Sequence, residues 1–218
     1  MTLVIFDCDG VLVDSEVLSN GLLAEMMTEL GHAMTTEEAL QKFAGRSLVD
    51  VLALAESVLG HPIPEDLGRD YGRRLSERLR HELKPVAGAK EAVAALSCPR
   101  CVASSSTFER IRLSLDVTGL APLFGDNIFS ATQVAHGKPA PDLYLFAAEA
   151  MAAAPSTCVV VEDSPLGVSA GVAAGMTVIG FTGAEYGTGL AQRLSAAGAR
   201  WVIASMKQLP ATVTEFMH

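Results

Sequence analysis

Four short apolar runs in the sequence lack the polar alternation of a half-exposed strand. They lie at residues 3–6, 100–104, 157–163 and 176–181 and read "LVIF", "RCVAS", "TCVVVED" and "MTVIGF". Continuous apolar runs of this length are typical of parallel strands that are covered on both faces. Helical patterns rich in Ala and Leu alternate with them, over 88–97, 107–117, 141–153 and 165–174. The alternation predicts an α/β fold, a Rossmann-like doubly wound parallel sheet with right-handed crossovers.

The segment 15–84 follows a different pattern. Stretches such as "EVLSNGLLAEMMTEL" and "LVDVLALAESVL" carry helical periodicity, "GHAMTTEE" and "HPIPED" break it, and there is no convincing strand. We therefore expect residues 15–84 to form an all-helical cap that is inserted after the first strand. The catalytic core would then comprise residues 1–14 and 85–218, a size that suits one domain with an insertion.

Charge and composition limit which binding partners and which cellular location we expect for this chain. A formal net charge of −9 argues against nucleic acid or an anionic membrane as the main partner. There is no secretory signal pattern and no run that approaches the ~20 apolar residues of a membrane span. Four cysteines without such a signal indicate reduced thiols, and we take the C-x-x-C at 98–101 as structural. We expect a cytoplasmic protein, a monomer or weak homo-oligomer, that acts on a small molecule.

Polar side chains gather at the ends of the predicted strands. The strand ends and the "HGKPAPD" segment supply Asp7, Asp9, Ser104, Ser105, Lys138, Glu162 and Asp163. Ligands of doubly wound sheets bind at the carboxyl ends of the strands, so we expect these groups to converge on one rim.

This set of groups suits phosphoryl transfer. Converging carboxylates favour a hard dication such as Mg²⁺, which together with Lys138 would offset the crowded negative charge. Asp7 could then attack phosphorus and form an aspartyl-phosphate. Asp9 could protonate the leaving alcohol and later deprotonate water. Ser104, with backbone N–H groups such as that of Ser105, would hold the phosphate oxygens.

The segments "DCDGVLVD", "ASSS", "KPAPD" and "VEDS", in this order, resemble the four motifs of the haloacid dehalogenase superfamily, in the subfamily with a helical cap after the first strand. The resemblance implies that Asp7 is the nucleophile and Asp9 the acid/base. It also implies that Mg²⁺ binds the Asp7 side chain, the Asp9 backbone carbonyl and Asp163, with Glu162 near or in the coordination shell.

Further positions favour hydrolysis within the superfamily. Dehalogenases lack the second aspartate, so Asp9 argues for phosphoryl chemistry. The beta-phosphoglucomutases carry a cap histidine at the position that matches Ser19, and this chain therefore lacks it. Arg46, directly after Gly45, could grip an anionic substrate. Both Glu16 and Arg46 could contact substrate or be ordinary surface charges, and we keep both readings.

A second group of sequence segments bears on the class of substrate. The chain resembles the bacterial phosphogluconate phosphatases in the segments "DCDGVLVDSEV", "FAG" in the cap and "CPRC". This resemblance favours phosphorylated sugars or sugar acids as substrates. Two alternatives stay open at this point. One is a phosphotransferase similar to beta-phosphoglucomutase, and the other is a non-catalytic phosphate-binding module on the same fold.

Overall fold

The computed structural model describes residues 2–44, 46, 48–183 and 189–217. The chain divides into two compact units. One comprises Met1–Asp14 and Lys84–His218 and contains the sheet, and the other, Ser15–Leu83, is helical. We refer to them as the sheet unit and the helical unit and describe each by itself.

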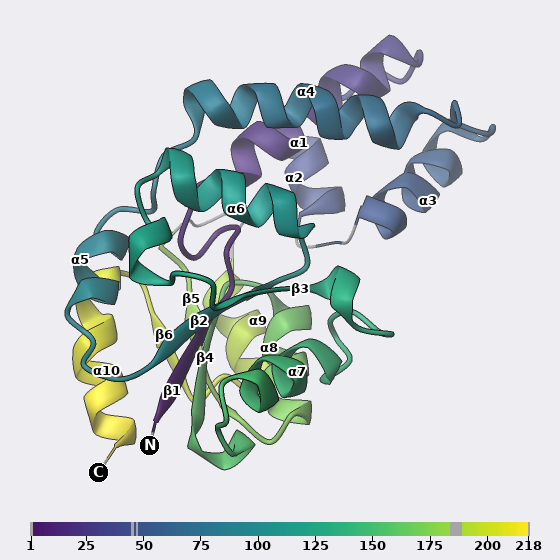
Figure 1. The fold of residues 1–218 in the computed structure, drawn as a ribbon. Coiled ribbons are helices and arrows are strands. Elements are labelled where there is room, and N and C mark those ends of the chain that lie inside the picture. The colour runs from purple at the N-terminus through teal and green to yellow at the C-terminus, as the bar shows by residue number, and fades with distance from the viewer. Residues whose placement is uncertain (1, 45, 47, 184–188, 218) are drawn as a thin grey trace. The chain divides into compact units, whose positions relative to one another are not determined.

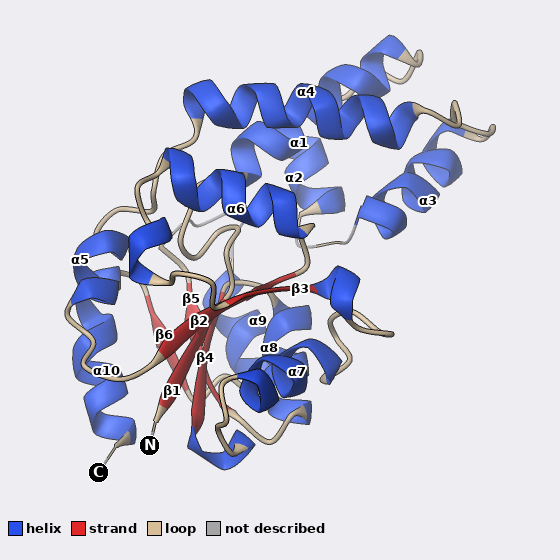
Figure 2. Cartoon of the chain, in the orientation of Figure 1, coloured by secondary structure: helices blue, strands red, loops and turns tan. Residues whose placement is uncertain are grey.

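The sheet unit is built on six parallel strands. They are β1 (Leu3–Phe6), β2 (Arg100–Ser104), β3 (Ile128–Ser130), β4 (Cys158–Glu162), β5 (Thr177–Phe181) and β6 (Trp201–Ile203). Their order in the sheet is β3-β2-β1-β4-β5-β6. Figure 2 shows the strands in red among the helices. In this doubly wound order the direction of winding reverses beside β1, where such folds bind their ligands. The predicted fold class is confirmed.

Helices cover both faces of this sheet. The helices of the sheet unit are α5 (Ala89–Ala94), α6 (Phe108–Val117), α7 (Asp142–Ala150), α8 (Pro165–Ala173), α9 (Leu190–Ala196) and α10 (Leu209–Phe216). In Figure 1, α5 and α10 lie on one side of the strands and α7, α8 and α9 on the other. Two-sided coverage explains why the strands read as unbroken apolar runs.

The centre of the core is β1, which pairs with β2 on one side and β4 on the other. All four of its residues are buried. Ile5 packs in a cluster with Val160 of β4 and Tyr144 of α7. Phe6 contacts the ring of Phe124 edge-on, with 5.8 Å between the ring centres. Burial on both sides holds the end of β1, and the polar residues that follow it, in a rigid setting.

The sequence-based prediction missed two strands. β3 and β6 have three residues each and form the two edges of the sheet. Edge strands this short carry too few residues for a recognisable pattern. The predicted helices are present, although they are shorter than expected: the one predicted over 141–153, for example, ends at Ala150.

The helical unit comprises α1 (Glu16–Glu29), α2 (Thr36–Phe43), α3 (Leu48–Leu59) and α4 (Leu67–Glu82), and no strand occurs among its described residues. Helix α1 packs against α2 and α4. Met26, Met27 and Leu79 are buried. Within the described ranges, no helix combines the length and the apolar character needed to cross a membrane.

Candidate active site

Three neighbouring strands of the sheet unit deliver polar groups to one edge. Asp7 follows β1 directly, and its N–H donates to the carbonyl oxygen of Val161 in β4 at 3.0 Å. Ser104 is the last residue of β2. Glu162 is the last residue of β4, and Asp163 follows it. Parallel strands place their carboxyl ends at the same edge, so these groups share one site.

Lys138 connects the groups of this site. Its ammonium donates to Asp7 Oδ1 at 2.9 Å, to Glu162 Oε1 at 2.6 Å and to the carbonyl oxygen of Ala103 at 3.3 Å. The Lys138 side chain is only 5% exposed. Burial alone would lower its pKa, but the carboxylates of Asp7 and Glu162 outweigh burial and raise the pKa of Lys138 well above its ordinary value. The ammonium is therefore a fixed cation.

Glu162 is fully buried and saturated with hydrogen bonds. Its Oε1 accepts from Lys138 and from the Tyr144 hydroxyl, the latter at 2.8 Å. Its Oε2 accepts from the Ser164 N–H at 3.0 Å and the Ser164 hydroxyl at 2.9 Å. Burial would raise the pKa of Glu162, but Lys138 and these donors outweigh it and lower the pKa below its ordinary value. The group is an ionised carboxylate with about four acceptor positions in use.

Asp7, Glu162 and Asp163 each bring a carboxylate oxygen within 4.8 Å of the other two. Gly10 makes room for this cluster, because a Cβ built there would overlap the Asp163 carboxylate. Its φ of +78° also suits glycine. Burial is the main cause that raises the pKa of Asp7 to about 7; Lys138 opposes the rise, and Glu162 and Asp9 add to it. An oxygen-only cluster of this kind fits a hard dication, which would favour the ionised form of Asp7.

Asp9 has two partners from the segment that follows β2. Its Oδ2 accepts from the Ser106 hydroxyl at 2.6 Å, and its Oδ1 accepts from Arg110 Nη2 at 2.9 Å. Arg110 was not among the predicted site residues. Its position in the sequence could have indicated a place at the site, because it lies in the first turn of α6, the helix that starts at the carboxyl end of β2.

The two serines that were predicted, with Lys138, to bind phosphate differ in their surroundings. Ser104 is buried, and its hydroxyl oxygen accepts from the Ser106 N–H at 3.1 Å. A hydroxyl that accepts one hydrogen bond can still donate its own proton. Ser105 is exposed in the bend that follows. Thr107, as the N-cap of α6, accepts from the Arg110 N–H at 3.4 Å.

The two predicted substrate contacts from the cap, Glu16 and Arg46, belong to the helical unit. Glu16 is the first residue of α1, and its carboxylate accepts from Asn20 Nδ2 at 2.9 Å. Arg46 is exposed and donates from Nε to the carbonyl oxygen of Lys42 at 3.1 Å. Gly45 of the predicted motif lies outside the described residues. Contact of Glu16 and Arg46 with substrate stays a prediction.

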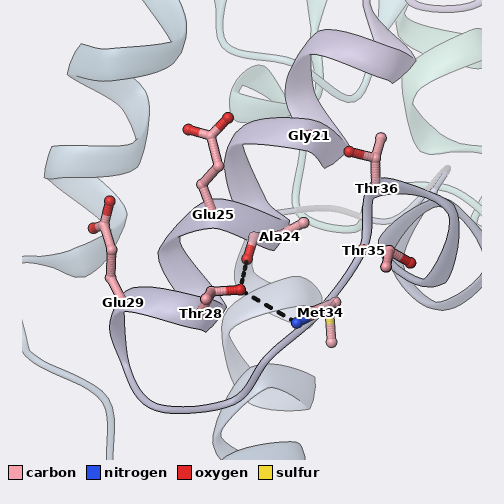
Figure 3. A pocket seen from close by; sticks show the side chains of 8 residues that line it. All are labelled: Gly21, Ala24, Glu25, Thr28, Glu29, Met34, Thr35 and Thr36. Atoms are coloured by element: carbon pink, nitrogen blue, oxygen red, sulfur yellow. Dashed lines mark hydrogen bonds between the residues drawn. The ribbon is translucent and has the colours of Figure 1, made fainter.

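The helical unit also contains a pocket of about 460 Å³. Figure 3 shows that it lies along α1 and the start of α2, with the Thr28 hydroxyl donating to Ala24 O at 2.9 Å and accepting from Met34 N at 3.2 Å. Its two carboxylates, Glu25 and Glu29, form ion pairs with arginines of α4. None of the predicted site residues is in its described lining, which is Gly21, Ala24, Glu25, Thr28, Glu29, Met34, Thr35 and Thr36. The candidate active site is therefore the edge of the sheet.

Solved structures share the whole fold of the chain. A conserved haloacid dehalogenase-like protein of unknown function from Agrobacterium tumefaciens is 38% identical, with a TM-score of 0.88 and full coverage of both chains. A HAD family hydrolase from Deinococcus radiodurans, solved with bound phosphate and sodium, is 34% identical, with a TM-score of 0.78. That comparison covers 100% of this chain and 96% of the other.

Sequence comparisons agree with the structural ones. The 6-phosphogluconate phosphatase of Escherichia coli is 31% identical over 179 residues, which is 82% of this chain and 81% of that protein. The family model for haloacid dehalogenase-like hydrolases matches residues 4–181, from β1 to the end of β5. The resemblance inferred from the four motifs is confirmed, and the chain is a member of the haloacid dehalogenase-like hydrolase family.

Proposed function

We propose that this protein is a Mg²⁺-dependent phosphatase that hydrolyses a sugar phosphate or a sugar-acid phosphate through an aspartyl-phosphate. The observation that carries the proposal is the Lys138 ammonium, which joins Asp7 at 2.9 Å to Glu162 at 2.6 Å beside the Asp163 carboxylate. The likeness to a phosphatase of a phosphorylated sugar acid supports the substrate class.

In the first half of the reaction, the Asp7 carboxylate attacks phosphorus and the bond from phosphorus to the sugar oxygen breaks. Asp9 donates a proton to the leaving oxygen, so that a neutral alcohol departs. Lys138 offsets the negative charge that builds up beside Asp7. The Ser104 hydroxyl and the N–H groups of the following turn donate to the phosphoryl oxygens. The product is an aspartyl-phosphate at Asp7.

In the second half, the Asp9 carboxylate removes a proton from a water molecule as that water attacks the phosphorus of the aspartyl-phosphate. The bond from phosphorus to the Asp7 oxygen breaks, inorganic phosphate leaves, and Asp7 returns to its carboxylate form. Asp9 regains the proton that it had donated, so the proton balance of one turnover closes.

For the metal we propose the side chains of Asp7 and Asp163 and the backbone carbonyl of Asp9 as ligands. A bound Mg²⁺ supplies positive charge that lets a phosphate dianion approach the carboxylates. Glu162 was expected near or in the coordination shell. Its two oxygens already accept from Lys138, Tyr144 and twice from Ser164, so we assign Glu162 the role of holding Lys138 in place.

Residues 15–84 would act as the cap that selects the substrate. Exclusion of bulk water protects a reactive acyl-phosphate from uncontrolled hydrolysis, and mobile caps commonly provide it. We propose Glu16 and Arg46 of the helical unit as substrate contacts. The guanidinium of Arg46 suits the carboxylate or hydroxyl end of a sugar acid.

The test is phosphate release from a panel of sugar phosphates and sugar-acid phosphates with and without Mg²⁺. We expect EDTA to abolish turnover and added Mg²⁺ to restore it. Asp7→Asn removes the nucleophile, so kcat should fall by more than about 10³-fold, as for loss of other catalytic nucleophiles. Asp126→Asn is the matched control, because that aspartate is fully exposed at a turn. Undiminished turnover by Asp7→Asn, or in EDTA, would refute the proposal.

The same assays separate the two alternatives. A mutase would convert β-glucose 1-phosphate into glucose 6-phosphate, whereas a phosphatase releases inorganic phosphate. The position of the mutase histidine holds Ser19, whose hydroxyl donates to the Glu16 carbonyl oxygen at 3.1 Å, and this favours hydrolysis. A binding module would turn over neither these sugars nor p-nitrophenyl phosphate.

A further inference from the structure

Both oxygens of the Asp9 carboxylate are bound by one short segment, residues 104–110. Arg110 Nη2 donates to Oδ1 at 2.9 Å and the Ser106 hydroxyl donates to Oδ2 at 2.6 Å. The carboxylate of an aspartate can rotate around the two bonds of its side chain. Because each oxygen accepts from a different donor, the plane of the carboxylate is held in one orientation. Asp9 is therefore oriented by side chains that the reaction scheme above does not use.

The segment that binds Asp9 is itself held in place. The Ser106 N–H donates to Ser104 Oγ at 3.1 Å, and the Ser130 hydroxyl donates to the Ser106 carbonyl oxygen at 2.7 Å. Arg110 lies in the first turn of α6, which Thr107 caps. The proposed phosphate ligand Ser104 is thus connected to Ser106 and Arg110, which bind Asp9, through hydrogen bonds and the first turn of α6.

The ion pair is also shielded from water. The side chains of Arg110 and Asp9 are 24% and 14% exposed. Exposed ion pairs hold their geometry weakly, whereas a shielded pair with charge-assisted hydrogen bonds holds it better. By contrast Arg112, two residues further along α6, is 43% exposed. It lies 3.6 Å from Asp116 and 3.8 Å from Asp126 and donates to the carbonyl oxygen of Gly125 at 3.3 Å.

We propose that Arg110 is a positioning residue for proton transfer, which together with Ser106 aims the Asp9 carboxyl at the leaving-group oxygen. This inference rests on the proposed function, since it assumes that Asp9 is the general acid. Proton transfer is sensitive to small displacements of the acid, and a misplacement of about 1 Å can cost about 10²-fold in rate. In this role Arg110 acts on turnover through its contact with Asp9.

The choice of substrate gives this role a distinct signature. A sugar alcohol needs a proton as it leaves, whereas p-nitrophenolate is stable enough to leave without one. The value of kcat/KM covers the steps up to and including formation of the aspartyl-phosphate. If the Asp9 carboxyl is no longer oriented toward the leaving-group oxygen, kcat/KM should therefore fall for a sugar phosphate. For p-nitrophenyl phosphate kcat/KM should stay nearly unchanged.

The experiment compares both substrates in Arg110→Met, Arg110→Lys, Ser106→Ala and the control Arg112→Met, using the full chain with Mg²⁺ and the best sugar phosphate of the panel. For Arg110→Met we expect kcat/KM to fall by about 30-fold or more with the sugar phosphate, within the usual contribution of general acid catalysis. With p-nitrophenyl phosphate the fall should be less than about 3-fold, because that substrate does not depend on the acid. Arg110→Lys should recover part of the loss, and Arg112→Met should change neither value.

The possible outcomes separate this inference from the proposed function. Equal losses with both substrates, or a gain with the sugar phosphate, would overturn the positioning role. Absence of any phosphatase activity in the native protein would overturn the proposed function instead. Thermal unfolding checks that each variant is folded. If Arg110→Met does not fold, Ser106→Ala and Arg110→Lys decide the matter, since each should show the same split between substrates at smaller size.

Discussion

At the scale of single residues, the buried carboxylate of Glu162 holds the Lys138 ammonium in place. Transferring a carboxylate from water into a protein interior costs several kcal/mol even after relaxation. Here Glu162 is fully buried, and it accepts from four donors, one of which is the Lys138 ammonium. Lys138 also lies 4.9 Å from the centre of the Tyr144 ring. This arrangement gives the ammonium one position, which a role in charge neutralisation requires.

Glu162→Gln tests this interpretation. The amide keeps the shape, but its NH₂ group must face a donor and its charge is gone. We expect the free energy of unfolding to fall by about 3 kcal/mol, the lower end for a broken buried ion pair, since Asp7 still binds Lys138. The value of kcat should fall by about 10²-fold because the ammonium is misplaced.

Urea unfolding and steady-state kinetics measure the two effects. Glu149→Gln, an exposed position on α7, is the matched control and should change neither. If kcat of Glu162→Gln equals that of the native protein, Asp7 alone holds Lys138 and the assigned role of Glu162 is wrong.

At the scale of elements, the start of α8 is fitted to the carboxylate beneath it. Ser164 is the N-cap: its hydroxyl accepts from the Gly167 N–H at 3.0 Å and donates to Glu162. A Cβ built on Gly167 would overlap the carboxylate of Glu162. Only glycine therefore lets the first turn of α8 approach the end of β4 this closely.

Two glycine-to-alanine substitutions in helices should have opposite signs. Gly167→Ala inserts a methyl group into a filled space, so we expect the free energy of unfolding to fall by about 1–3 kcal/mol. At Gly72 in α4, a Cβ has no heavy atom within 4 Å from the described residues beyond its chain neighbours and the helix's own backbone. Gly72→Ala should raise the stability of the helical unit by about 0.5–1 kcal/mol, the helix preference of alanine over glycine. Chemical denaturation followed by circular dichroism tests both, and a stabilising Gly167→Ala would refute the close fit.

At the scale of the whole molecule, the four cysteines report on the sheet unit. All are free thiols; Cys8, Cys101 and Cys158 are buried and Cys98 is half-buried. Burial raises the pKa of all four, that of Cys158 to about 11. Thiolates are the reactive form, so buried thiols with raised pKa values react slowly.

We therefore expect a thiol reagent at pH 8 to modify Cys98 first, and the other three only when the sheet opens. The time course of labelling, with and without denaturant, measures this difference. Cys98→Ser should remove the early phase and leave the late one unchanged. Four thiols that react at one rate in the native protein would contradict the packing of β1, β2 and β4.

Much of the architecture could be predicted from local patterns. β1, β2, β4 and β5 were predicted because a strand buried on both faces needs a continuous apolar run, which is visible in the residues themselves. Asp7, Ser104 and Glu162 follow or end such runs, so chain connectivity alone places them at one edge. β3 and β6 were missed because three residues at a sheet edge carry almost no periodic signal.

The sequence by itself determined the four central strands, the doubly wound fold class and the groups at the carboxyl ends of those strands, because these depend on neighbours along the chain. Tertiary structure alone decided which of those groups bind one another. Arg110 meets Asp9 across 101 residues and Tyr144 meets Glu162 across 18. Such contacts depend on the rotation of α6 and α7 against the sheet, which packing settles only once the whole core has formed.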